Sequence, residues 1–545
     1  MKNKDICLSK TWEFVLKAMI ALSIPFLSLM TSFYIFKLPH AFRVMCIAIF
    51  LSFVVGIFVL RKIDLSRLRK KDLFFSALMG LYAGQYFSRY GRMVLDTFFG
   101  KAFKIIKVSI SLTDVFKIIR FALIPACIFY AYLFIKYIVP KIKKFLKSLT
   151  IGERRYLKVV EGVGIVVVLL LAFNTNLFYR PTYNNKIVVS DVVYTSDTGA
   201  LVYHDAFTNF RMEENDIRQP LFGLCAFPFG LVARFASQFM FFLPNYSYEL
   251  TLMFIQFLLL AFTLIMLARI IKLDEKDKKY FYLLFSCSFP YLLFSVVVEQ
   301  YVIGLFYLTL TFYLYFTNDK INYAFIGATG TLLTSGITFP LITKFKNCKQ
   351  WIKDIMWCAV IFLVVMTLSG QLVQLPYVFK TLTNLSRFTG KIPFVDKLYQ
   401  FTHFVKGIFI ASPGEVVFLE DIPRYFLKAF DSYSLIGIGI LVIVFVSFLL
   451  NRKDKMSVIA FLWIIFSFII LVVVGWGTAE NGLILYSLYF AWAYLLLIYK
   501  FIRSIIKDVK KANILIVCLV ILLFLCNIKE LYQIIKFGLD YYSMW

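Results

Sequence analysis

The sequence predicts an all-α polytopic membrane protein, and three observations support this class. Apolar residues make up 61% of the 545 residues. Long runs such as Val163–Phe173, Leu250–Leu267 and Ile436–Leu450 contain no charged residue, and about 20 such residues cross a bilayer core as a helix. Basic residues gather in short runs between the apolar segments, as they do in the cytoplasmic loops of membrane proteins.

Applying these criteria along the chain predicts about 13 transmembrane helices. The N-terminus is expected inside and the C-terminal tail outside, since this arrangement keeps the most basic loops in the cytoplasm. The expected spans are Trp12–Phe36, Phe42–Leu60, Leu73–Tyr90, Val115–Val139, Val159–Phe178, Glu249–Ile271, Tyr280–Val298, Tyr301–Phe316, Trp351–Gly370, Tyr433–Leu450, Met456–Gly475, Leu483–Lys500 and Asn513–Ile528.

Two further apolar segments are expected not to cross. Pro220–Leu243 is predicted to lie along the outer surface as a juxtamembrane helix, because a crossing there would move every later basic loop outside. Asn322–Ile342 has cytoplasmic flanks on both sides and is interrupted by glycines and Pro340, so it is predicted to form a re-entrant helix pair. We expect an N-terminal region, 1–158, with four spans, and a membrane core, 159–545, with outer loops 179–248 and 371–431.

Composition also argues against other classes. The net charge of +28 suggests nucleic-acid binding, but the basic residues follow the spacing of membrane loops, so no nucleic-acid partner is expected. The nine cysteines include no C-x-x-C pair, which indicates neither a disulfide framework nor a zinc site. The first apolar stretch is too long for the core of a signal peptide and is interpreted as a retained span.

Polar residues concentrate in two segments expected on the outer face. The acidic loop, Tyr179–Gln219, contains six carboxylates: Asp191, Asp197, Asp205, Glu213, Glu214 and Asp216. The basic loop, Gln371–Asp431, carries Lys380, Arg387, Lys391, Lys397, His403 and Lys406 in its first half. A carboxylate can take a proton from an acceptor hydroxyl, and a cationic cluster can neutralise a phosphate leaving group. The pairing suits glycosyl transfer from a lipid-linked sugar phosphate.

The order of motifs resembles the GT-C superfamily of integral membrane glycosyltransferases. A long apolar helix ending at Asn174–Phe178 is followed by Ser196-Asp197-Thr198-Gly199, and Glu214-Asn215-Asp216-Ile217-Arg218-Gln219-Pro220-Leu221 then opens an expected interfacial helix. The resemblance covers roughly Val159 to the C-terminus. It implies a GT-C-like core, an inverting sugar transfer and a polyprenyl-phosphate sugar donor.

By position, the resemblance makes Asp197 the catalytic base, with Asp216 as its rival. The resemblance also makes Glu214, Arg218, Gln219 and Glu299 candidates for substrate contacts. The outer-loop positions of Arg387, Lys391, His403, Lys406 and Glu480 make these residues further candidates. Thr198 stands where a second acid is frequent and Gln219 where histidine is common. No metal ligand set is therefore assigned, and a divalent cation stays open as a cofactor.

The expected partners are the lipid-linked donor, a glycan or lipid acceptor and membrane lipids. The expected location is the bacterial plasma membrane, with the active site on the outer face and a role in cell-surface glycan or glycolipid assembly. Two alternatives remain. A flippase or transporter would place ionisable residues near mid-membrane in two related halves, and a polysaccharide polymerase or ligase would use a large basic outer loop.

Overall fold

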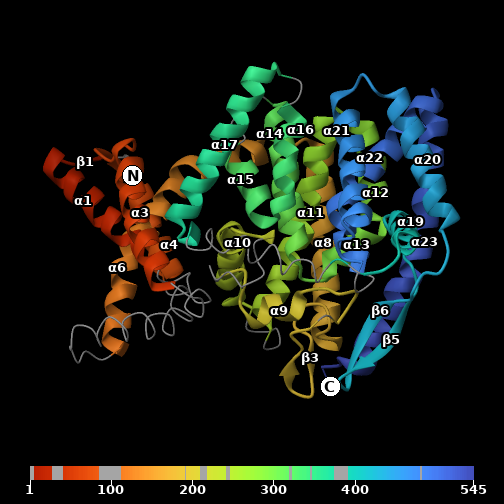
Figure 1. Ribbon diagram of the computed structural model, residues 1–545, viewed down its shortest axis with the longest axis horizontal. Helices are drawn as coiled ribbons and strands as arrows, with labels where there is room; N and C mark the ends of the chain where they lie inside the picture. Colours follow the sequence, from red (N-terminus) through yellow and green to blue (C-terminus); the bar gives the residue numbers. More distant parts are fainter. Residues whose placement is uncertain are drawn as a thin grey trace. The chain divides into compact units, whose positions relative to one another are not determined.

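The computed structural model describes residues 5–27, 41–84, 112–190, 192–208, 218–240, 246–317, 322–343, 346–372, 389, 391–478 and 482–544 (Figure 1). The chain forms two compact units. Unit 1 comprises Met1–Leu149, Ala206–Leu231 and Ile352–Thr383, and unit 2 comprises Thr150–Asp205, Val232–Trp351 and Asn384–Trp545. The first unit break, between Leu149 and Thr150, lies close to the boundary at residue 158 drawn from the sequence.

Within the described ranges, 8 helices are long and apolar enough to cross a membrane, which supports an integral membrane protein rich in α-helix. They are α3 (Ala41–Arg61), α6 continued through a π-turn into α7 (Leu112–Leu133, Phe134–Ile138, Val139–Lys147), α8 (Ile151–Asn174), α11 (Ser247–Ile270), α17 (Cys348–Leu368), α21 with its π-turn (Lys455–Phe468, Ile469–Val473), α22 with the preceding 3₁₀ turn (Gly482–Tyr486, Ser487–Ile505) and α23 (Val509–Tyr541).

The predicted total of about 13 crossings stays a prediction. Three helices on expected spans, α4 (Lys70–Gly84), α14 (Gln300–Phe316) and α20 (Leu435–Leu450), have 15, 17 and 16 residues. These lengths fall below the roughly 20 residues that a perpendicular crossing needs. The first expected span, Trp12–Phe36, coincides with α1 (Lys10–Ser23) over its described part.

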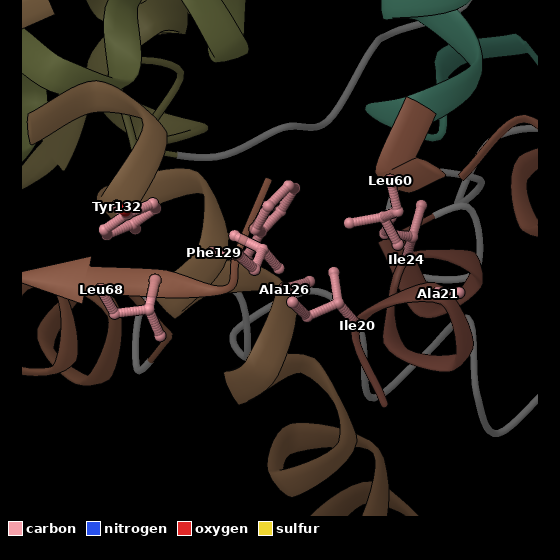
Figure 2. Packing of buried hydrophobic residues seen from close by; sticks show 9 residues of the cluster. Ile20, Ala21, Ile24, Leu60, Leu68, Ala126, Phe129 and Tyr132 are labelled. Atoms are coloured by element: carbon pink, nitrogen blue, oxygen red, sulfur yellow. The ribbon is translucent and has the colours of Figure 1, made fainter. Parts of the chain in front are cut away.

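Unit 1 has a compact apolar core between α1, α3 and α6 (Figure 2). Ile20 and Ile24 of α1, Leu60 of α3 and Phe129 of α6 are all buried in it. Strand β1 (Asp5–Cys7) pairs antiparallel with β2 (Arg67–Arg69), which brings the chain start beside the end of α3. The hydroxyl of Tyr130 donates to the carbonyl of Leu368 at 3.1 Å and so attaches α17 to this core.

Unit 2 is built around α14, which packs against both α11 and α22 (Figure 1). In the most apolar stretch of α22, 94% of the residues are buried, against 28% for α8. The interior of this unit is aromatic: Trp463, Trp492 and Tyr489 are each almost completely buried. Large aromatic side chains therefore form part of the core of this unit.

Several local expectations were wrong. The expected span Tyr280–Val298 is two helices, α12 (Glu275–Ser286) and α13 (Phe289–Val296), because Pro290 in the first turn of α13 cannot continue a preceding helix. Helix α23 runs 13 residues beyond the expected end at Ile528. The described part of this mainly helical chain also contains three short antiparallel strand pairs, which were not predicted: β1–β2, β3–β4 (Thr182–Tyr183, Lys186–Ile187) and β5–β6 (Gly414–Leu419, Ile422–Leu427).

The two segments expected not to cross are short helices. Pro220–Leu243 contains α10 (Phe222–Ser237), with 16 residues, and its surface orientation stays a prediction. Asn322–Ile342 is broken, as expected, into α15 (Asn322–Thr331), a 3₁₀ turn (Leu333–Ile337) and α16 (Thr338–Thr343). Ser335 in the break is buried and hydrogen-bonded to the hydroxyl of Tyr489. Ser335 is thus enclosed by protein, whereas Leu333 and Ile337 of the same turn are 39% and 37% exposed.

A pair of glycines in α20 tests the packing of unit 2. A Cβ at Gly437 would lie 1.9 Å from the carbonyl oxygen of Thr402 in α19 (Phe394–Gly407), whereas a Cβ at Gly439 meets no atom within 4 Å. We predict that Gly437→Ala lowers the free energy of unfolding by about 1–3 kcal/mol, because backbone must move. Gly439→Ala should change it by less than about 0.5 kcal/mol. Thermal unfolding of the purified protein checks both, and equal effects would contradict the packing.

Candidate functional site

Asp197 lies half-buried at the start of the short helix α9 (Thr198–Tyr203). Its backbone N–H donates to the carboxylate of Glu299, 102 positions away in sequence. One oxygen of its own carboxylate, Oδ2, accepts a hydrogen bond of 2.8 Å from the side-chain amide of Gln300. The structure therefore brings together Asp197 and Glu299, two of the residues selected from the sequence.

Glu299 is completely buried at the turn between α13 and α14. It caps α14, because its Oε2 accepts the N–H of Gln300 at 3.0 Å while Oε1 accepts the N–H of Asp197. Its backbone is held by Gln256 of α11, which accepts the N–H of Glu299 at 3.3 Å and donates to its carbonyl at 3.1 Å. A carboxylate at a helix N-terminus is stabilised by the helix dipole, so the position suits a charged group.

The side chain of Asp197 does not cap the helix that it precedes. An aspartate at such a position ordinarily accepts a backbone N–H from the first turn. Here that carboxylate is turned toward Gln300 instead. The anchoring of α9 comes from its neighbours: the hydroxyl of Thr198 donates to the carbonyl of Val298 at 3.0 Å. Helix capping therefore does not position the Asp197 carboxylate; its hydrogen bond with Gln300 does.

The backbone just before Asp197 is strained. Tyr194 and Thr195 have φ angles of 49° and 63°, in the left-handed region that side chains other than glycine rarely adopt. Each such residue costs roughly 1–3 kcal/mol and persists only where surrounding contacts fix it. Close packing also requires Gly199, since a Cβ there would lie 1.8 Å from the carbonyl oxygen of Val188.

The contacts that fix this backbone come from the basic loop and from α23. The N–H of Tyr194 donates to the carbonyl of Tyr425 in β6 at 2.9 Å, and the N–H of Tyr425 donates to the carbonyl of Val192 at 2.8 Å. The hydroxyls of Tyr194 and Tyr425 both donate to Oε1 of Glu530, at 2.9 and 2.6 Å. Glu530 lies in the part of α23 beyond the expected span and also accepts the N–H of Gly414.

The basic loop carries three described candidate residues. Lys391 is exposed, and His403 and Lys406 lie half-buried in α19. The ring of His403 stacks on Phe430 with centroids 3.9 Å apart, and its Nε2 lies 3.2 Å from the carbonyl of Ser432. Burial lowers the pKa of His403, and the charge of Lys406 lowers it further. Burial also lowers the pKa of Lys406. The stacking on Phe430 thus gives His403 a packing role, in addition to the substrate contact expected from the sequence.

The other selected residues divide into two groups. Arg218 and Gln219 lie before α10 in unit 1, Gln219 almost completely buried and Arg218 half-buried. Asp216, Glu214, Arg387 and Glu480 lie outside the described residues. Of the remaining carboxylates of the acidic loop, Asp205 forms an ion pair with Arg234 of α10 at 2.6 Å. That pairing supports a structural role for Asp205.

Reasoning from the sequence missed three residues of this arrangement. Gln300 follows Glu299 directly and takes the first position of α14, so its adjacency to a selected carboxylate was a usable signal. Gln256 is a lone amide inside an otherwise apolar helix, and polar groups there usually bond to other protein groups. Glu530 was not selected from the sequence, because it was expected in the C-terminal tail, beyond the last span.

The arrangement can orient one carboxylate for proton transfer. Among the residues that the structure describes, no group of three or more His, Cys, Asp or Glu side chains could hold a metal ion.

No family of known sequences, no curated protein and no solved structure matches this chain. The geometry of the site is therefore the basis for proposing its function.

The Glu530 contacts predict a graded response to substitution. Glu530→Ala removes the acceptor of two tyrosine hydroxyls and one N–H, and we expect a loss of about 3–5 kcal/mol in the free energy of unfolding. Glu530→Gln keeps a neutral acceptor and should cost about 1–2 kcal/mol. Chemical or thermal unfolding in detergent measures both. Similar, small losses in the two variants would show that these hydrogen bonds do not hold the acidic loop.

The pKa of His403 predicts a pH effect of defined sign. A folded-state pKa below the usual 6.5 means that the unfolded chain binds the proton more tightly, so stability falls as pH drops through about 6.5 and levels off below the folded-state pKa. His403→Phe keeps a ring against Phe430 and removes the titration. Melting temperatures between about pH 7.5 and 5 should therefore fall less in this variant. Parallel curves for both proteins would contradict the assignment.

Proposed function

We propose that this protein is a membrane glycosyltransferase that moves a sugar from a polyprenyl-phosphate donor to an acceptor hydroxyl, with Asp197 as general base. The observation that carries the proposal is the carboxylate of Asp197, which is held by Gln300 beside the buried Glu299 and does not cap its own helix. Strained backbone directly before it supports a functional role, since such strain is concentrated at active sites.

The proposed reaction is a single inverting displacement. The acceptor oxygen attacks the anomeric carbon and forms the new glycosidic bond, while the bond from that carbon to the phosphate oxygen of the carrier breaks. The acceptor proton passes to the carboxylate of Asp197, and the electron pair of the broken bond leaves with the phosphate. Gln300 donates to Oδ2 of Asp197 and fixes the direction in which the carboxylate faces.

Cations of the basic loop are proposed to stabilise the departing phosphate. Strand β6 of this loop pairs with Val192–Tyr194, three to five positions before Asp197, so the two loops form one connected structure. Lys406 is the strongest described candidate, because its charge is half-buried and a less hydrated cation interacts more strongly with an anion. The proposed placement is the outer face of a bacterial plasma membrane, in cell-surface glycan or glycolipid assembly.

The central prediction concerns Asp197. Asp197→Asn keeps the size of the side chain but cannot accept the proton, so we expect sugar transfer to fall by about two to four orders of magnitude. The matched control is Asp421→Asn in the exposed β5–β6 turn, where Asp421 has a φ of 61° that asparagine tolerates. The measurement is transfer from a lipid-linked sugar by purified protein, with equal folding of all variants verified by thermal unfolding.

Asp216 is the other candidate for the general base, and a substitution at this position distinguishes the two residues. Asp216→Asn should cost only about 1 kcal/mol of local stability if this residue is a helix cap. Near-normal transfer by Asp197→Asn together with an inactive Asp216→Asn would assign the base to Asp216. Movement of the lipid-linked sugar across vesicles, without transfer to any acceptor, would instead indicate a flippase.

A further inference from the structure

Unit 2 contains a groove whose lining includes none of the residues that hold Asp197. It has a volume of about 580 Å³ and is lined by α8, α11, α12 and α13. Its walls are mostly apolar, formed by side chains such as Val160, Phe257, Leu260 and Leu264. Val163 and Leu283, which also line it, are 51% and 46% exposed, so the groove opens on an apolar surface of the unit. In a membrane protein, such a surface faces lipid chains.

One end of the groove is basic. Arg155, near the start of α8, and Lys279, in the second turn of α12, line it there and are both exposed. Among the described residues, neither forms an ion pair with a carboxylate. The third cation, Lys278, is already neutralised: it pairs with Glu275 and with the buried Glu153, which also binds Arg269. The end of the groove thus presents two cations that no protein carboxylate neutralises.

Two tyrosine hydroxyls give an independent indication of a ligand. Tyr282 and Tyr291 line the groove, are 3% and 4% exposed, and their buried hydroxyls have no hydrogen-bond partner among the described residues. A buried hydroxyl without a partner costs free energy, which an ester or phosphate oxygen in the groove would recover. Tyr282 is one helical turn beyond Lys278, close to the basic end, and its ring stacks on Tyr156 at 4.3 Å.

We propose that this groove binds one anionic phospholipid of the adjacent leaflet. One acyl chain lies along the apolar wall, the phosphate lies at Arg155 and Lys279, and the hydroxyl of Tyr282 donates to an oxygen of the headgroup or glycerol region. The start of α8, the start of α12 and the end of α11 all lie at this end, which places it at a membrane interface where headgroups reside. The site requires no sugar transfer and is separate from the proposed function.

The contacts of Glu275 at this end explain why it leaves the two cations unpaired. A Cβ at Gly152, another lining residue, would lie 2.7 Å from a carboxylate oxygen of Glu275. The hydroxyl of Thr150 donates to that same oxygen at 3.0 Å. Glu275 is thus held against the start of α8 and engaged with Lys278, and it does not neutralise Arg155 and Lys279.

The test uses the full-length protein in nanodiscs or mixed micelles containing phosphatidylglycerol or, for comparison, phosphatidylcholine with the same acyl chains. Native mass spectrometry should show one retained phosphatidylglycerol, and the melting temperature should rise with this lipid and not with phosphatidylcholine. The double variant Arg155→Gln/Lys279→Gln should bind phosphatidylglycerol about thirtyfold more weakly. Val163→Trp, which fills the exposed rim, should also displace the lipid.

The matched control is Lys158→Gln/Lys276→Gln, which removes two exposed charges from the same helices at positions that do not line the groove. It should retain the lipid with nearly unchanged affinity. Equal weakening in the two double variants would show diffuse attraction and overturn the site. Preferential binding of a polyprenyl phosphate over phosphatidylglycerol would also overturn it, because the occupant would then be the carrier lipid.

Discussion

The structure around the candidate site depends on a carboxylate with no exposure to solvent, that of Glu299. Moving such a group out of water is costly unless hydrogen bonds and favourable dipoles replace its hydration. Glu299 obtains both at the N-terminus of α14, where it accepts the N–H of Gln300 and, from the acidic loop, the N–H of Asp197. The same interaction that stabilises the buried charge therefore fixes the position of Asp197, and Gln300 then sets the direction of the Asp197 carboxylate.

A second buried carboxylate holds the other side of the loop. Glu530 collects hydrogen bonds from Tyr194 and Tyr425, so α23, β6 and the acidic loop meet at a single oxygen atom. The end of the same helix is also joined to the end of α8, just before the loop, because the hydroxyl of Thr175 donates to the carbonyl of Gly538 at 3.0 Å. These contacts over-determine the left-handed backbone of Tyr194 and Thr195. The described segment around Tyr194 is held in this way by hydrogen bonds from residues far away in the sequence.

Local sequence patterns were sufficient to predict a helical membrane protein and the break in Asn322–Ile342. They also selected both Asp197 and Glu299, whose contact only the structure reveals. They failed where long-range contacts decide the outcome. Apolar content cannot distinguish a lipid-facing helix such as α8 from α22, which other helices bury. The extension of α23 beyond Ile528 is stabilised by Asn527 and Glu530, whose partners lie more than 100 positions away. The strain at Tyr194 has no signature in residue type, since tyrosine and threonine rarely adopt that conformation.

The proposed reaction requires the acceptor hydroxyl to lie within hydrogen-bond reach of Asp197. This requirement is tested most directly by an experimental structure of the full-length protein with a non-hydrolysable polyprenyl-phosphate sugar analogue and an acceptor bound. The acceptor hydroxyl should lie about 3 Å from a carboxylate oxygen of Asp197, on the side of the sugar opposite the phosphate. A sugar bound with its anomeric carbon beyond the reach of Asp197, beside another carboxylate of the acidic loop, would contradict it.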